Sequence, residues 1–348
     1  MGFTPVESGL GGAMIGLSAL VAYLSDGKIT GISGILGPFL KNVMVCQLEV
    51  WKMLFLIGLI LGGLANNAWN ASFAFPGAEP FSTYRYLAAG IAVGAGSRLQ
   101  RGCTSGHGIC GLPRFSQRSW MAVPSFMLLA GIVVYVTRHV LVVDPAKEPG
   151  IAALEWPPSL HFPVAALGVS LMLTALSFAP LGAVHGVICP LSCGTIFGLG
   201  LGVAGMTSQD KVLDFLDVAG YWDPSLAFVM GLGICVSFPA FYKGEKEGAK
   251  PVCAEKFENP PKTGDTGSLL IGAALFGLGW GLTGICPGPG LAGTVPNLVN
   301  SSGTAGLGFA MCTVATGCTW VITDGALKIS SSVPVPRTNS DEKPLLPN

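Results

Sequence analysis

The stretch RLQRGCTSGHGICG, residues 98–111, interrupts a chain that is long and apolar on both sides. It combines four glycines and two cysteines with two arginines and a histidine. Glycines at this density do not continue a helix comfortably. Irregular backbone between apolar helices is tolerated at membrane depth only where protein or a water-filled cavity satisfies its polar groups. We therefore expect this stretch to be a loop that turns back inside a helical bundle.

The composition of the chain is that of a membrane protein. Half of its 348 residues are hydrophobic, the mean hydropathy is +0.60, and 11 % of the residues are charged. Soluble domains have about 25 % charged residues. The formal net charge is zero, and no basic amphipathic run occurs, so we expect neither a nucleic-acid partner nor attachment to a membrane surface alone. We expect the lipid bilayer to be the solvent of most of the chain.

Apolar stretches recur along the chain and lack the period-2 alternation of membrane β-strands. The predicted fold is therefore an all-α membrane protein with about nine transmembrane helices, inverted internal repeats and re-entrant loops made of broken helices. The nine stretches are residues 9–24, 51–68, 84–97, 120–143, 162–184, 193–206, 224–242, 268–284 and 303–323.

The distribution of Lys and Arg predicts the orientation, because cytoplasmic loops are enriched in basic residues. Nine crossings place one group of basic residues on the same side: Lys28, Lys41, Lys52, arginines 98, 101, 114 and 118, and the lysines between Lys243 and Lys262. We expect an integral protein of the plasma membrane with its N-terminus outside and its C-terminus in the cytoplasm. Residues 243–267 would form a charged cytoplasmic loop, and residues 326–348 a disordered cytoplasmic tail.

A second glycine-rich segment resembles the first. Written above GLGWGLTGICPGPGL from Gly277, the segment from Gly94 aligns Cys103 with Cys286. A fainter pair aligns Gly31 with Gly205. Residues 1–184 and 185–325 are therefore predicted to be two inverted halves, a pattern that indicates a transport site near the bilayer centre. Four broken segments would meet there: 31–34, 102–108, 205–208 and 284–290.

The broken segments carry the candidate binding residues. Freed backbone N–H groups and the following helix starts favour anions. A thiol is a soft, weak donor, suited to a substrate with its own exposed sulfur and weak enough to release it. We expect Cys103 and Cys286 to be the central ligands. The accompanying candidates are Thr104, Ser105, Gly106, His107, Gly108, Pro287, Gly288, Ser33, Gly34 and Thr207.

Other residues admit a simpler interpretation. Glycines such as Gly58, Gly62 and Gly63 are expected to serve helix packing. His107 has no CxxC or HxxxH partner, so neither a metal nor any other cofactor is expected, and its role would be loop hydrogen bonding or attraction of an anion. The inner mouth of a pathway is a possible place for four further residues, although the arginines also fit the positive-inside rule. These are Cys189, Cys193, Arg98 and Arg101.

The sequence resembles the YeeE/YedE family of sulfur transporters over most of the chain, to about Thr323. The matching motifs are LSDGKITGISGILG at 24–37, GSRLQRGCTSGHGICGL at 96–112, FGLGLGVAGMTSQDKVLDFLD at 197–217 and LFGLGWGLTGICPGPGLA at 275–292. The resemblance implies a nine-helix inverted repeat in which Cys103 and Cys286 hold the terminal sulfur of thiosulfate through S–H hydrogen bonds. Members have a further pathway cysteine in the first repeat, which this chain lacks, and Ser18 or Ser33 would be its substitute.

We therefore expect a transporter for thiosulfate uptake rather than an enzyme, with a soluble cytoplasmic sulfur-accepting protein as a possible partner. One alternative is a carrier of another sulfur or selenium anion on the same scaffold. The other is a membrane thiol oxidoreductase with a disulfide between Cys103 and Cys110 or between Cys189 and Cys193. The absence of a CxxC motif argues against the oxidoreductase.

Overall fold

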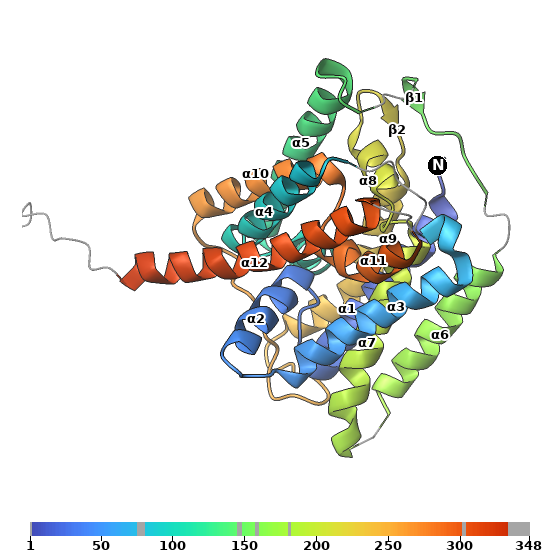
Figure 1. The fold of residues 1–348 in the computed structure, drawn as a ribbon. Helices are drawn as coiled ribbons and strands as arrows, with labels where there is room; N and C mark the ends of the chain where they lie inside the picture. Colours follow the sequence, from blue (N-terminus) through green and yellow to red (C-terminus); the bar gives the residue numbers. More distant parts are fainter. Residues whose placement is uncertain are drawn as a thin grey trace, which may run out of the picture.

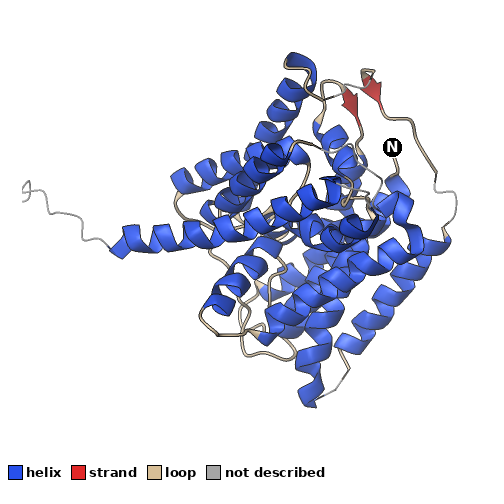
Figure 2. Cartoon of the chain, in the orientation of Figure 1, coloured by secondary structure: helices blue, strands red, loops and turns tan. Residues whose placement is uncertain are grey.

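The computed structural model describes residues 2–74, 81–144, 148–156, 160–179, 182–300 and 304–332. Helices make up nearly all of the regular structure, and two short strands lie at one end of the bundle (Figure 2). The elements are α1 Pro5–Asp26, α2 Ile32–Met44, α3 Val50–Ala74, α4 Thr83–Leu99, the π-helix η1 Ser105–Gly111, α5 Gln117–Tyr135, the π-helix η2 Val136–Val140, β1 Gly150–Ile151, α6 His161–Ser177, the 3-10 helix η3 Gly182–Val184, α7 His185–Val203, α8 Gln209–Leu216, β2 Tyr221–Trp222, α9 Ser225–Gly244, α10 Thr266–Thr283, α11 Pro287–Asn300 and α12 Thr304–Ser332.

The predicted class, an all-α membrane protein, is confirmed. By length and composition, seven helical segments of the described chain are apolar enough to cross a membrane, and one of them joins α10 to α11. Each of the nine apolar stretches coincides with a helix, but α4 and α6 have only 17 residues each. A straight helix needs about 20 residues to cross the hydrocarbon. The count of nine crossings therefore stays a prediction.

Four short elements begin within or directly after the four broken segments of the sequence. They are α2, η1, α8 and α11, and each begins within a few residues of a glycine turn. Gly205 and Gly284 adopt left-handed φ angles of 69° and 71°. Only glycine takes this conformation without a steric cost, so these residues end the preceding helices and let the chain reverse. The broken segments are thus real interruptions between longer helices.

Close helix packing depends on glycine at the contact points. A Cβ atom added to Gly194 of α7 would lie 2.0 Å from the carbonyl oxygen of Phe55 on α3, and one added to Gly58 would lie 2.2 Å from that of Leu191. Gly63 meets the carbonyl oxygen of Ala292 at 2.1 Å in the same way. Backbones that approach this closely gain van der Waals contact, which drives helix association in lipid. The packing role expected of such glycines is confirmed.

The helix contacts occur in matched pairs. Helix α3 packs against α7 as α1 does against α9, and α4 packs against α12 as α10 does against α5. Of the short elements, α11 contacts α3 and α12, whereas η1 contacts α9 and α5. These contacts are reproduced when each element is exchanged for its counterpart: α1 for α7, α3 for α9, α4 for α10, η1 for α11 and α5 for α12. Helix α6 has no counterpart and lies along the outside of α7 (Figure 1).

Two details differ from the sequence-based expectations. Strands β1 and β2 pair in parallel, with Gly150 opposite Tyr221. A two-residue strand is too short to leave a recognisable pattern in the sequence. Helix α12 continues to Ser332 and extends away from the bundle (Figure 1), so residues 326–332 are helical instead of disordered. Neither Gly nor Pro occurs between Ala326 and Ser332, and Pro334 is the first helix breaker. The rest of the predicted tail lies outside the described residues.

Candidate functional site

A small cavity at the meeting point of the two cysteine loops is the candidate site. It has a volume of about 60 Å³ and is lined by both Cys103 and Cys286, whose side chains are buried. The hydroxyl oxygen of Thr104 lies 3.5 Å from Cys286 Sγ, and that of Ser105 lies 3.3 Å from Cys103 Sγ. The loops of the two halves therefore touch each other through hydroxyl and thiol groups.

The walls of this central cavity are mainly apolar. Phe126, Phe197, Phe215 and Trp280 contribute aromatic surface, and the apolar lining leaves few polar partners for an ion that has lost its water. The indole Nε1 of Trp280 is buried and has no hydrogen-bond partner among the described residues. An anion in the cavity would supply the missing acceptor. Trp280 was not among the sequence candidates, and its only signal was a polar aromatic residue inside the glycine-rich GLGWGL run.

Hydrogen bonds within the first loop hold its shape. The two ring nitrogens of His107 lie 3.0 Å from Ser119 Oγ and 3.2 Å from the carbonyl oxygen of Gln100. A Cβ atom on Gly102 would lie 2.6 Å from the His107 ring, so a glycine is needed where the loop passes the histidine. Both nitrogens of His107 are therefore occupied by the protein itself. These contacts fit the role in loop hydrogen bonding.

A second, larger cavity of about 270 Å³ lies beside the first and is basic. We call it the basic vestibule, defined by Lys28, Arg101, Arg114 and Arg118 in its lining. Glu245 takes up part of this charge, because Arg114 Nε donates to its carboxylate at 3.0 Å. Burial opposes ionisation of Glu245, but hydrogen bonds from Lys262 and Arg114 hold its pKa below the usual value. Lys28 and Lys52 are paired with Glu258 and Glu49, which also line the vestibule. The attraction of anions therefore rests mainly on Arg101 and Arg118.

A wall one residue thick separates the central cavity from the basic vestibule. Gly31 and Gly106 line the vestibule, whereas their neighbours Ile32 and Ser105 line the cavity. The Ile32 N–H donates to Ser105 Oγ at 3.2 Å, and a Cβ atom on Gly31 would lie 3.2 Å from Gly106 Cα. The GISG turn and the first cysteine loop therefore meet backbone to backbone. Any larger side chain at Gly31 would thicken this wall.

The other expected site residues are distributed around these two spaces. Gly288 lines the cavity, and Thr207 is buried next to Met206, which also lines it. Pro287 is the first residue of α11. Gly34 and His107 line the vestibule, as does Arg101.

Several candidates lie apart from both cavities. Ser33 is buried, and its Oγ has no hydrogen-bond partner among the described residues. Arg98 forms an ion pair with Asp324 at 2.6 Å and does not line the vestibule. A Cβ atom on Gly108 would face Met230 Sδ at 3.3 Å. Cys189 and Cys193 are buried within α7 and line neither cavity.

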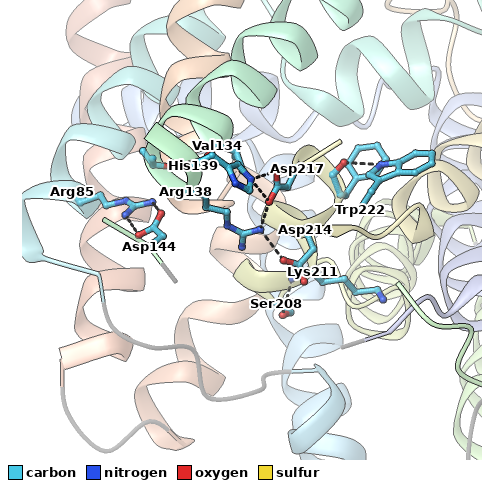
Figure 3. Close-up of polar contacts among 12 residues, drawn as sticks. Arg85, Val134, Arg138, His139, Asp144, Ser208, Lys211, Asp214, Asp217 and Trp222 are labelled. Atoms are coloured by element: carbon cyan, nitrogen blue, oxygen red, sulfur yellow. Dashed lines mark hydrogen bonds and ion pairs between the residues drawn. The ribbon is translucent and has the colours of Figure 1, made fainter. Parts of the chain in front are cut away.

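A buried ionic cluster includes side chains of α8 and lies near the end of α5 and the start of α9 (Figure 3). Arg138 Nη1 lies 2.9 Å from Asp214 Oδ1 and 3.2 Å from Asp217 Oδ2. Lys211 Nζ donates to Asp223 at 3.0 Å, and neither side chain is exposed. Because α8 also carries Phe215, these pairs hold one wall of the central cavity in place. The sequence gave no sign of this pairing, because Arg138 lies 76 residues from Asp214 in the chain.

Short broken helices that meet at a central cavity of a helical bundle are a feature of membrane transporters. Comparisons with known proteins agree. A family described as sulphur transport matches residues 3–134, and a family of unknown function, DUF6691, matches residues 185–321.

A probable transporter of Xylella fastidiosa (strain 9a5c) is 43 % identical over 103 residues, covering 29 % of this chain and 70 % of the relative. Another from the same strain is 40 % identical over 121 residues, covering 34 % of this chain and 84 % of the relative. The chain belongs to the YeeE/YedE family of sulfur transporters.

Proposed function

We propose that the protein takes up thiosulfate and that the anion passes between Cys103 and Cys286. One observation carries this proposal: both thiols line the same small cavity, in loops that touch where Thr104 Oγ1 lies 3.5 Å from Cys286 Sγ. A thiol donates a weak hydrogen bond and is polarizable, so it suits the terminal sulfur of thiosulfate. Weak binding allows the anion to leave, which flux requires.

The two spaces suggest the order of events along the path. The anion would shed water in the apolar cavity, where Trp280 offers an N–H donor in addition to the thiols. It would then cross the wall between Gly31 and Gly106 and enter the basic vestibule, whose arginines attract an anion. Because basic residues favour the cytoplasmic side, the vestibule would face the cytoplasm, and uptake would run from the cavity to the vestibule. On this basis the N-terminus is outside, and a soluble sulfur-accepting protein would meet the anion at the vestibule.

The matched helix contacts support the division into two inverted halves, residues 1–184 and 185–325. In this scheme Cys103 and Cys286 occupy equivalent places, and their loops enter from opposite leaflets. The unpaired helix α6 supplies the odd crossing that inverts the second half. The proposed inversion therefore brings the two cysteine loops together at the proposed central site.

Uptake of radiolabelled thiosulfate into liposomes tests the proposal. We expect Cys103→Ala and Cys286→Ala each to lower the uptake rate on the order of 10-fold or more, because each removes a hydrogen bond to a charged substrate worth about 1.5–3 kcal/mol. Cys312→Ala is the matched control, since Cys312 is also buried but does not line the cavity. Equal uptake by wild type and both loop variants would refute the route between the thiols.

Competition experiments on the same liposomes distinguish thiosulfate from the other candidate anions. Excess unlabelled thiosulfate should suppress uptake, whereas sulfate, which lacks an exposed terminal sulfur, should compete weakly. Stronger competition by sulfite or a selenium oxyanion would assign the carrier to that anion instead. A mass change on reduction would indicate a disulfide and support the oxidoreductase, but all ten cysteines are free thiols in the structure.

A further inference from the structure

Three side chains with metal-binding atoms meet where α1 ends and α7 begins. Asp26 is the last residue of α1, and His185 and Cys189 lie one turn apart on the same face of α7. One ligand atom from each lies within 4.8 Å of the others. Asp26 and His185 are 159 residues apart in the chain, so only the packing of α1 against α7 brings them together.

The hydrogen bonds of this cluster leave one nitrogen unused. His185 Nε2 lies 2.8 Å from Asp26 Oδ1 and 3.1 Å from Ser25 Oγ. Trp51 Nε1 donates to the other oxygen of Asp26 at 2.7 Å. His185 is only 9 % exposed, and its buried Nδ1 has no hydrogen-bond partner among the described residues. The nitrogen that faces Asp26 is Nε2, so an ion held between these side chains would replace the hydrogen bonds of Nε2, and Nδ1 would carry the ring proton.

The donor set identifies the class of ligand. A carboxylate oxygen, an imidazole nitrogen and a thiolate sulfur together suit Zn²⁺, whereas Ca²⁺ and Mg²⁺ prefer oxygen ligands alone. We propose that Asp26, His185 and Cys189 bind a divalent metal ion of the zinc class. Around zinc, ligand atoms about 2.0–2.3 Å from the metal lie roughly 3.5 Å apart. The three ligand atoms, which lie within 4.8 Å of one another, would adjust to this spacing by side-chain rotation, and binding releases the thiol proton of Cys189.

Access to the metal site is open from the surface. A depression of about 490 Å³ includes Asp26, His185 and Cys253 in its lining. The Cys253 N–H donates to the carbonyl oxygen of Ser25 at 2.8 Å. This hydrogen bond holds the charged loop, residues 243–267, beside the site. An ion reaching the depression would meet Asp26 and His185 first, because Cys189 is fully buried. Three protein ligands leave a fourth position for water.

The site lies apart from the proposed transport route and does not rest on it. Neither the central cavity nor the basic vestibule includes Asp26, His185 or Cys189 in its lining. Helices α1 and α7 are equivalent in the matched contact pattern and pack against each other. A bound ion would therefore cross-link the two halves of the bundle and stabilise the folded protein.

Metal binding to the purified full-length protein tests this inference. After a chelator has stripped the protein, we expect it to bind one equivalent of Zn²⁺, with an increase in the thermal unfolding midpoint. With Co²⁺ as the probe, the Cys189 thiolate should give a near-ultraviolet charge-transfer band. Cys189→Ser should abolish the band, and Asp26→Asn and His185→Gln should each weaken binding on the order of 10-fold or more.

Two controls keep the inference falsifiable. Cys312→Ser removes a buried thiol elsewhere, and Cys103→Ala removes a thiol of the central cavity, so both should bind Zn²⁺ as wild type does. Size-exclusion profiles and circular dichroism show which variants are folded, and Asp26→Asn preserves the shape of the side chain. Failure of the stripped wild type to bind Zn²⁺, or an unchanged charge-transfer band in folded Cys189→Ser, would overturn the assignment and leave a hydrogen-bonded pair between α1 and α7.

Discussion

The two cysteine loops occupy corresponding places in the bundle but are chemically different. After Cys103 the chain continues with Thr104 and Ser105, whereas after Cys286 it continues with Pro287 and Gly288. The first loop leads into a π-helix, and the second leads directly into the regular helix α11. Proline suits the first position of a helix because its missing N–H is not needed there.

In the proposed site, the two loops contribute different chemical groups. The first loop supplies side-chain hydroxyls: Thr104 reaches Cys286, and Ser105 accepts a hydrogen bond from Ile32. The second loop supplies a thiol and space, since Gly288 has no side chain to fill the cavity. A related scaffold in both halves thus carries an asymmetric site, so equivalent substitutions should have unequal effects.

The largest of these effects is expected from filling the space that the second loop leaves open. A Cβ atom on Gly288 would contact Ile32 and Leu201 at 3.5 Å, so the added methyl groups of Gly288→Val would project into the cavity. Overpacking costs about 1–3 kcal/mol, and we expect thiosulfate uptake to fall on the order of 10- to 100-fold. Gly168→Val on α6, where a Cβ atom has nothing within 4 Å, is the matched control for liposome uptake. Unimpaired uptake by Gly288→Val would place the route elsewhere.

A smaller effect, on stability, is expected from Ser105→Ala in the first loop. The substitution leaves the buried N–H of Ile32 without its acceptor, which should lower the free energy of unfolding by about 1–3 kcal/mol. Ser33→Ala is the control, because Ser33 Oγ has no hydrogen-bond partner among the residues that the structure describes. Thermal unfolding in detergent measures both variants. If both serine variants unfolded at the same temperature, the hydrogen bond from Ile32 to Ser105 would not stabilise the contact between the GISG turn and the first cysteine loop.

The smallest effect is expected from Thr104→Val, which keeps the side-chain shape and removes only the hydroxyl. Loss of the contact with Cys286 should cost about 0.5–1.5 kcal/mol, equivalent to a roughly 2- to 10-fold increase in KM for uptake. Thr104→Ser retains the hydroxyl and should stay close to wild type. Uptake measured over a range of thiosulfate concentrations distinguishes the two, and equal KM values would show that the hydroxyl does not support the site.

Much of the scaffold was predictable because its signals are local. Apolar stretches marked the helices, and glycines such as Gly205 and Gly284 marked the places where the chain must reverse. The alignment of the segments from Gly94 and Gly277 predicted that the loops of Cys103 and Cys286 would meet, but not which other side chains would line the space between them. Trp280 was missed because an aromatic residue in an apolar helix resembles ordinary packing. The spacing of His185 and Cys189 was visible, but Asp26 lies far away in the chain, so the cluster could not be recognised.

By itself, the amino-acid sequence determined that this protein belongs in a membrane and where its helices break, because partition into lipid and the conformational freedom of glycine depend on local composition. Only the tertiary structure decided which side chains share a cavity. It placed Trp280 in the lining of the same cavity as Cys103 and Cys286, paired Arg98 with Asp324, and paired the charged side chains of α8 with buried partners. Such contacts join residues far apart in the chain, and they depend on how closely glycine allows neighbouring helices to pack.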